Sequence, residues 1–122
     1  MNNISINIWG RQFLLPIEYD VYPEESIAQL QKESIESFIS KVSTTSDKNI
    51  SEYVIQHDGK QIGEVIDNIF RYVMPRYFYV PLDAQKRVVA IMCDYRFDEE
   101  HGLAIIYENE ILKEIGPQDI VL

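Results

Sequence analysis

Alternation of apolar and polar residues marks the start of the chain as a β-hairpin. Isoleucines occupy every second position of residues 4–9, which is the period of a strand with one buried face. Trp9 is then expected on the face opposite the isoleucines. Gly10 and the residue after it suit a type II′ turn, because glycine supplies the positive φ that this turn requires. Residues 12–22 predict the returning strand, in which Pro16 lacks a ladder donor and indicates a bulge or an edge position.

The next segment, residues 23–42, predicts an amphipathic helix. Pro23 suits the first helical position, and Glu24 and Glu25 follow where the helix dipole favours carboxylates. Apolar residues then recur at helical spacing and define a face that packs on the rest of the protein. The expected polar side carries Gln31, Lys32, Glu33 and Glu36. Residues 43–49 contain no apolar side chain and predict a loop.

The middle of the chain is less clear. Residues 50–60 could form a short strand or a short helix, and we favour a strand that ends in a turn at His57-Asp58-Gly59. The strongest helical pattern follows, with apolar residues at i, i+3, i+4 and i+7 spacing up to Pro75, which should end the helix. These apolar residues are Ile62, Val65, Ile66, Ile69, Phe70, Val73 and Met74.

The last third of the chain predicts strands. Residues 76–82 are rich in aromatics, and residues 87–97 have a middle that is apolar on both faces, as expected of a covered central strand. Two shorter strands, 103–108 and 110–116, would be joined at Asn109. The predicted fold is a single α+β domain over residues 1–122. It has an antiparallel sheet of about five to seven strands, an N-terminal hairpin plus a C-terminal meander, with two amphipathic helices on one face.

Composition narrows the function classes. The 122 residues are 46% hydrophobic, enough for a folded core, and carry a formal net charge of −9. That charge repels phosphates and anionic lipid, so neither nucleic acid nor a membrane is an expected partner, whereas a basic protein would be attracted. The single cysteine, Cys93, lies in an apolar run and is expected to be a buried hydrophobe. Because the start lacks a signal-peptide pattern and no apolar run reaches ~20 residues, a cytoplasmic protein is expected.

Candidate chemistry is concentrated between Cys93 and Gly102. This stretch separates two strand-like segments that must reverse direction. Asp98 is therefore expected to accept backbone N–H bonds, and Gly102 to adopt the left-handed conformation that closes a turn. We interpret the stretch as a hairpin loop with solvated side chains at its tip. Its ionisable side chains are Asp94, Asp98, Glu99, Glu100 and His101.

Other interpretations of this stretch have less support. Two histidines and one cysteine are too few for a typical zinc site, and the glycine turn of an EF-hand loop is absent around Asp94, Asp98 and Glu100. Exposed carboxylates at a loop tip should keep ordinary pKa values, which disfavours acid–base catalysis. The chain has no nucleophile elbow, P-loop or dinucleotide fingerprint. We therefore predict no catalytic residue, metal or cofactor.

Aromatic and basic residues alternate over residues 71–80. Such a pattern can stack single-stranded nucleic acid, but the charge of the whole protein opposes that partner. Alternating aromatics also fill ordinary strands, and we favour this packing role for Tyr72, Tyr77, Phe78 and Tyr79. If one face of the strand is exposed, its tyrosines and Arg71 and Arg76 suit a protein interface.

Two short motifs resemble those of a known family. A D-x-E-H-G motif and a C-terminal G-x-Q-D motif, with the opening "WGRQFLLPIEYD", resemble signatures of a family of small bacterial domains of unknown function. The similarity is clearest over residues 88–122 and fainter over 4–20. The resemblance implies kinship with domains encoded beside polymorphic toxin genes, several of which act as immunity proteins by binding a toxin. It implies no catalytic residues. The motif positions are Asp98, Glu100, His101, Gly102, Gly116, Gln118 and Asp119.

Three functional hypotheses follow. The leading one is a non-enzymatic cytoplasmic protein-binding module, of the immunity type, that sequesters a basic partner. The second is a structural domain that self-associates as a homodimer, because a central strand apolar on both faces needs two covers. The third is a metal-dependent enzyme that uses Asp94, Asp98, Glu100 and His101. The partner-binding surface of the leading hypothesis comprises Glu24, Glu25, Glu33, Glu36, Asp98, Glu99 and Glu100.

Overall fold

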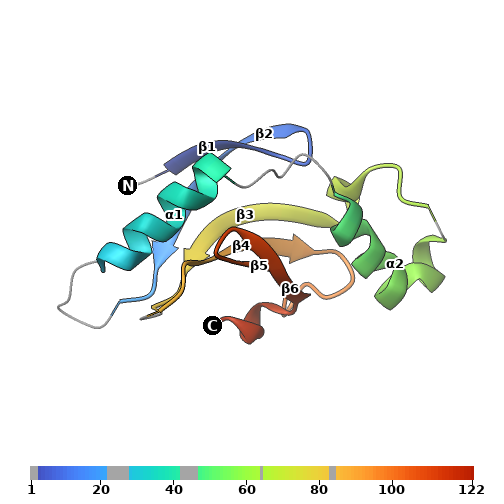
Figure 1. Ribbon diagram of the computed structural model, residues 1–122. Coiled ribbons are helices and arrows are strands. Elements are labelled where there is room, and N and C mark those ends of the chain that lie inside the picture. Colours follow the sequence, from blue (N-terminus) through green and yellow to red (C-terminus); the bar gives the residue numbers. More distant parts are fainter. Residues whose placement is uncertain (1–2, 22–27, 42–46, 64, 83–84) are drawn as a thin grey trace.

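A computed structural model describes residues 3–21, 28–41, 47–63, 65–82 and 85–122 (Figure 1). These residues form one six-stranded sheet in the order β1-β2-β3-β4-β5-β6, with two helices and two short 3₁₀ turns. The α+β fold predicted from the sequence is confirmed. The strands are β1 (Asn3–Ile8), β2 (Arg11–Tyr19), β3 (Val73–Val80), β4 (Val88–Tyr95), β5 (Leu103–Glu108) and β6 (Ile111–Gly116). The helical elements are α1 (Gln29–Lys41), α2 (Lys48–Ile62), η1 (Ile69–Arg71) and η2 (Gln118–Ile120).

The sheet is mixed rather than wholly antiparallel. β2 and β3 run parallel, with Ile17 opposite Phe78 and Tyr19 opposite Val80, whereas every other neighbouring pair is antiparallel. A parallel pair requires a long crossover connection, and the chain between β2 and β3 supplies one that contains both helices. Pro16 marks the place where β2 changes partner. Residues up to Pro16 pair with β1, and the pairing with β3 begins at the next residue.

The first hairpin turns one residue earlier than predicted. Ile8 pairs with Arg11, so the two-residue loop is Trp9-Gly10, and both loop residues have positive φ (50° and 85°). This is the signature of a type I′ turn rather than type II′. The left-handed conformation turns Trp9 into the same core as the isoleucines, and its ring lies 5.8 Å from that of Phe70. The expectation that Trp9 faces the opposite side is therefore wrong.

Helix α1 confirms most of the predicted amphipathic pattern. Ile35 and Phe38 are buried, and Lys32, Glu33 and Glu36 are exposed. Gln31 was expected on the polar side, but it is 1% exposed. Its amide N–H groups donate to the backbone oxygens of Asp20 (2.7 Å) and Val80 (3.2 Å), and its side-chain oxygen accepts from the Ala28 N–H (2.9 Å). These bonds tie the start of α1 to the ends of β2 and β3, which explains why a polar residue is buried there.

The middle of the chain corrects two predictions. Residues 50–60, favoured as a strand, belong to α2, whose Ile50 and Val54 are buried one turn apart. The helix predicted up to Pro75 does not form. Instead α2 ends at Ile62 and is capped by Gly63 (φ 88°), η1 follows, and β3 begins at Val73. Pro75 lies inside β3 beside a register shift, where the missing N–H is tolerated. The apolar residues that suggested this helix come from four successive segments, namely α2, a loop, η1 and β3. Their helical spacing is therefore coincidental.

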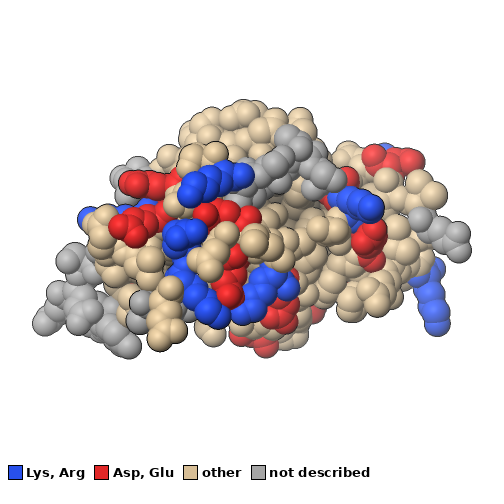
Figure 2. Space-filling model, in the orientation of Figure 1, with Lys and Arg blue, Asp and Glu red and all other residues tan. Residues whose placement is uncertain are grey.

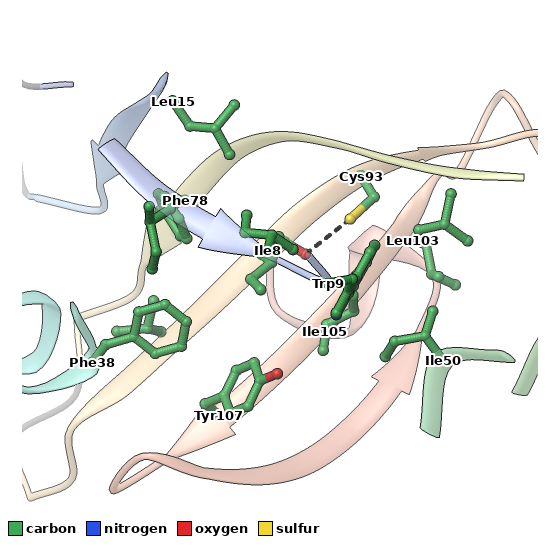
Figure 3. Close-up of a cluster of buried hydrophobic side chains, with 14 of the residues drawn as sticks. Ile8, Trp9, Leu15, Phe38, Ile50, Phe78, Cys93, Leu103, Ile105 and Tyr107 are labelled. Carbon is green, nitrogen blue, oxygen red and sulfur yellow. Dashed lines mark hydrogen bonds between the residues drawn. The ribbon is translucent and has the colours of Figure 1, made fainter. Parts of the chain in front are cut away.

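The two faces of the sheet are covered differently. The larger core lies between the sheet and both helices, where Phe38 of α1 packs edge-on against Phe78 (5.7 Å) and Tyr107 (5.1 Å) (Figure 3). A smaller cluster on the other face includes Ala90 and Met92. Val121 of the C-terminal segment packs against this second cluster, together with Tyr77 and Val88 from the sheet.

Candidate functional site

The loop that joins β4 to β5, residues 96–102, has a defined conformation. The Asp98 carboxylate accepts a bond from the His101 N–H (3.1 Å), and the Asp98 backbone oxygen accepts one from the Gly102 N–H (2.9 Å). Gly102 has φ 62°, in the left-handed region. The sequence prediction of an Asp98-initiated turn closed by Gly102 is therefore confirmed.

The C-terminal segment holds this loop in place. The Gln118 N–H donates to the His101 oxygen (3.0 Å), and the Gln118 side-chain amide donates to the Cys93 oxygen (3.0 Å). A Cβ on Gly102 would lie 2.6 Å from that amide nitrogen and 2.8 Å from the Cys93 oxygen, so only glycine fits. The two motifs singled out in the sequence are thus in direct contact, and together they fix the shape of the loop.

The carboxylates at the tip of the loop differ in whether they are hydrogen-bonded. Asp98 also contacts the His101 imidazole (2.9 Å), and this pairing raises the pKa of His101 and lowers that of Asp98. Glu99 and Glu100 are exposed. Neither of these two side chains has a hydrogen bond or a close ion pair with any residue that the structure describes. Glu100 is close enough to His101 to help raise the pKa of that ring, and Glu99 lines a hollow together with Arg71 and Arg96. The tip therefore offers two exposed carboxylates that are not hydrogen-bonded to the described part of the chain, on a turn held by backbone and Gln118 contacts.

Carboxylates at the other end of the strands are neutralised. Glu110, in the two-residue turn between β5 and β6, accepts two bonds from the Arg87 guanidinium (2.8 and 3.0 Å), and this contact lowers the pKa of Glu110. Glu108 is bonded to Lys113 and to Lys86, and these contacts lower its pKa. Figure 2 shows acidic and basic side chains intermingled over α1 and the strand ends beside it.

The acidic residues proposed for partner binding do not form one patch. Glu33 lies near Arg87, whose pKa it helps to raise, and Arg87 immediately precedes β4. Glu99 and Glu100 follow the other end of β4, a strand that spans roughly 25 Å. Glu36 lies near Tyr19, at the end of β2. Glu24 and Glu25 lie outside the described residues. The loop tip and α1 are therefore two separate surfaces.

A hydrogen bond that was not predicted from the sequence lies beside the loop. The Tyr95 hydroxyl donates to the Asp58 carboxylate, which comes from a non-helical residue (φ −132°) inside α2. Burial is the main cause that raises the pKa of Tyr95, and the bond to Asp58 adds to it. The two residues are 37 positions apart, and Asp58 alone had been interpreted as part of a turn. This bond anchors the kinked end of α2 to the end of β4.

An open hollow of about 440 Å³ lies beside this region, lined in part by Tyr72, Asp94, Arg96 and Glu99. Asp94 is bonded to Arg76 (2.6 Å), and the Arg96 guanidinium lies 6.0 Å from the centre of the Tyr72 ring. Among the described residues, no three His, Cys, Asp or Glu side chains are grouped as metal ligands. The metal-dependent hypothesis therefore gains no support from Asp94, Asp98, Glu100 and His101.

The remaining sequence predictions concern buried groups. Cys93 is fully buried, as expected, and burial raises the pKa of its thiol. Phe78 and Tyr79 of the aromatic–basic cluster are buried, which confirms their packing role, while Tyr72 and Tyr77 are half-buried. Within the described part of the chain, no helix has the length and apolar character needed to cross a membrane.

Comparison with known proteins gives a family but no characterised relative. A family model described as "Domain of unknown function (DUF6985)" matches residues 2–122. No curated protein and no solved structure has significant similarity to the chain. Because the match spans nearly the whole sequence, the chain belongs to this family of domains of unknown function.

Proposed function

We propose that the protein is a non-enzymatic cytoplasmic protein-binding module that recognises a basic partner through the tip of the 96–102 loop. The observation that carries this proposal is the pair of exposed carboxylates, Glu99 and Glu100, which have no hydrogen bond to the described residues and stand on a turn whose shape is fixed by Asp98 and Gln118. An immunity-type role, in which the partner is a basic toxin, is the specific form of this function that the motif resemblance favours.

Rigidity and charge act together in this proposal. A loop already ordered in the free protein loses less conformational entropy on binding than a flexible one. The net charge of −9 attracts a basic protein from a distance and raises its rate of association. The local charges at the tip then orient the complex, because Glu108 and Glu110 at the other strand ends are already engaged by basic side chains.

The test is affinity capture from a lysate of the source cells at low salt, followed by mass spectrometry. We expect one basic protein to be retained and to be released as the salt concentration rises, since screening weakens exposed charge pairs. The bait with Glu99→Lys and Glu100→Lys should lose this protein. A matched bait with Glu33→Lys and Glu36→Lys carries the same change of charge on α1 and should retain it.

The two variants separate the outcomes. Retention by the loop variant and loss by the α1 variant would move the binding surface to α1 and contradict the loop assignment. Equal loss by both would show that binding depends on total charge and on no particular surface. A wild-type bait that retains no basic protein would contradict the proposed function itself.

A further inference from the structure

The open hollow beside the 96–102 loop contains part of the aromatic–basic stretch that the proposed function does not use. Its walls come from two segments of the chain. One is η1 with the start of β3, and the other is the end of β4 with the loop. Together these segments contribute Phe70, Arg71, Tyr72, Asp94, Arg96 and Glu99. The volume of about 440 Å³ falls within the ~300–1,000 Å³ typical of small-ligand sites.

Backbone contacts and ring stacking hold the two segments together. Met74 pairs with Asp94 in the β3–β4 ladder. The Arg96 N–H donates to the Tyr72 oxygen (2.8 Å). The Tyr72 ring stacks on that of Phe97, with 5.5 Å between the ring centres and 16° between the planes. The hollow is thus formed in the protein without a ligand, which reduces the entropy lost when a ligand binds.

Two arginines of the hollow have charges that the described part of the chain does not neutralise. Asp94 is bonded to Arg76 (2.6 Å). Arg71 and Arg96 are exposed, and neither guanidinium has an ion pair or a hydrogen bond with any described residue. The Arg96 guanidinium does lie 6.0 Å from the centre of the Tyr72 ring, a contact that orients the guanidinium and leaves its charge in place.

The balance of charges around the hollow indicates the anion that it suits. Because the ion pair of Asp94 is neutral, two positive charges from Arg71 and Arg96 stand against one negative charge from Glu99. One net positive charge remains. A carboxylate carries one negative charge, and its two oxygens match the fork of N–H donors on a guanidinium.

Apolar surface lies beside these arginines. Phe70, Tyr72 and Met74 are each half-buried, and all three line the hollow. Aromatic rings pack favourably against other rings and against a thioether sulfur. A ligand for this hollow is therefore expected to carry a flat, apolar body as well as its carboxylate.

We propose that the hollow binds a small aromatic carboxylate, with the carboxylate bonded to Arg71 and Arg96 and the ring packed against Phe70 and Tyr72. This site is separate from the proposed recognition of a basic partner, because it takes a ligand of opposite charge through different side chains. Glu99 takes part in both, with opposite effects. It attracts a basic partner and repels an anion in the hollow.

An NMR titration of the ¹⁵N-labelled protein with 3-phenylpropionate at low salt and neutral pH tests the proposal. We expect the signals of Arg71, Tyr72 and Arg96 to shift, with a Kd on the order of 1 mM for a ligand of this size. The neutral amide of the same acid presents the same ring without the charge. It should bind at least about fivefold more weakly, since it loses the charged pairing.

Charge variants identify the groups that hold the carboxylate. Arg71→Gln and Arg96→Gln should each weaken binding at least about fivefold. Lys32→Gln is the matched control, because it removes the same charge from the exposed side of α1 and should leave the affinity unchanged. Glu99→Gln should tighten binding about twofold to fivefold. A folding defect would not produce a gain in affinity, so this variant tests the site independently of stability.

Four results would overturn the proposal. They are no shift at about 10 mM ligand, equal binding of the acid and its amide, equal weakening by Lys32→Gln and Arg96→Gln, and no gain from Glu99→Gln. Tighter binding of phenyl phosphate than of 3-phenylpropionate would overturn the assignment of a carboxylate. None of these results bears on the capture of a basic partner, so the two proposals stand or fall separately.

Discussion

Carboxylate side chains lie at both ends of the strands β4 and β5, but those at one end are ion-paired and those at the other are not. At the β5–β6 turn, Glu108 and Glu110 are bonded to lysines and an arginine. At the β4–β5 loop, Glu99 and Glu100 are exposed and have no such partner in the described part of the chain. A carboxylate bonded to its own chain contributes to folding, whereas an unpaired one remains available to a partner. Counting acidic residues in the sequence does not separate these two classes.

The ends also differ in how their backbones are held. The β5–β6 turn has only two residues, Asn109 and Glu110, both with positive φ. The longer β4–β5 loop depends on contacts with a distant segment, through Gly102 and Gln118. A two-residue turn is stable through local geometry, but a seven-residue loop needs tertiary contacts to keep one shape.

The largest predicted effect breaks the scaffold of the β4–β5 loop. Gly102→Ala should destabilise the fold by about 3 kcal/mol, because alanine disfavours the left-handed conformation and its Cβ would collide with Gln118 and the Cys93 oxygen. Gly10→Ala is the control. Gly10 also has positive φ but nothing within 4 Å of its Cβ position, so it should cost only about 1–2 kcal/mol. Urea unfolding of both variants measures the difference, and equal costs would contradict the tight contact.

An intermediate effect is predicted at the ion-paired end. The bond to Arg87 lowers the pKa of folded Glu110, so its stabilising contribution is present above the pKa of the unfolded chain and is lost as pH falls through the folded pKa. Glu110→Gln should therefore destabilise the protein at neutral pH, and the difference from wild type should shrink in acid. Thermal unfolding from pH 7 to pH 3 measures this trend. A difference that stays constant over this pH range would contradict the ion pair between Glu110 and Arg87.

The smallest predicted effect concerns the one ionic contact at the loop tip. The bond to Asp98 raises the pKa of His101, so an NMR titration of its ring should give a value above the ordinary ~6.5. The protonated ring stabilises the folded loop below the unfolded pKa, and this contribution disappears as pH rises through the folded value. Asp98→Asn should lower the pKa of His101. An unchanged titration in that variant would show that the pair does not form in solution.

Local signals predicted much of the fold. Alternation identified β1, and aromatic or apolar runs identified β4, β5 and most of β3. Asp98 and Gly102 identified the loop, because the residue types that favour a turn act through their own backbone. The errors arose where burial came from distant partners. Ile62, Ile69 and Val73 are close in sequence and follow a helical period, yet each packs from a different element. Gln31 looks like a surface residue until β2 and β3 supply its acceptors.

The same limit applies to the candidate site. The loop residues could be found from sequence, because the carboxylates are adjacent in the chain. That Glu110 is paired and Glu100 is not depends on Arg87, which is 23 residues from Glu110 and reaches it only after β4 and β5 have paired. The hydrogen bond from the Gln118 side chain to the Cys93 oxygen joins residues 25 positions apart, so no local sequence pattern predicts it.

The most direct test of the account is an NMR titration of the ¹⁵N-labelled protein with a short oligolysine peptide at low salt. The account predicts that the amides of Glu99 and Glu100 shift early and that those of Glu108 and Glu110 shift little. Both responses should vanish at high salt, because screening removes attraction between exposed charges. Equal shifts at the two ends, or larger shifts at Glu108 and Glu110, would contradict the claim that the carboxylates of the loop tip are more available to a basic partner than those of the β5–β6 turn.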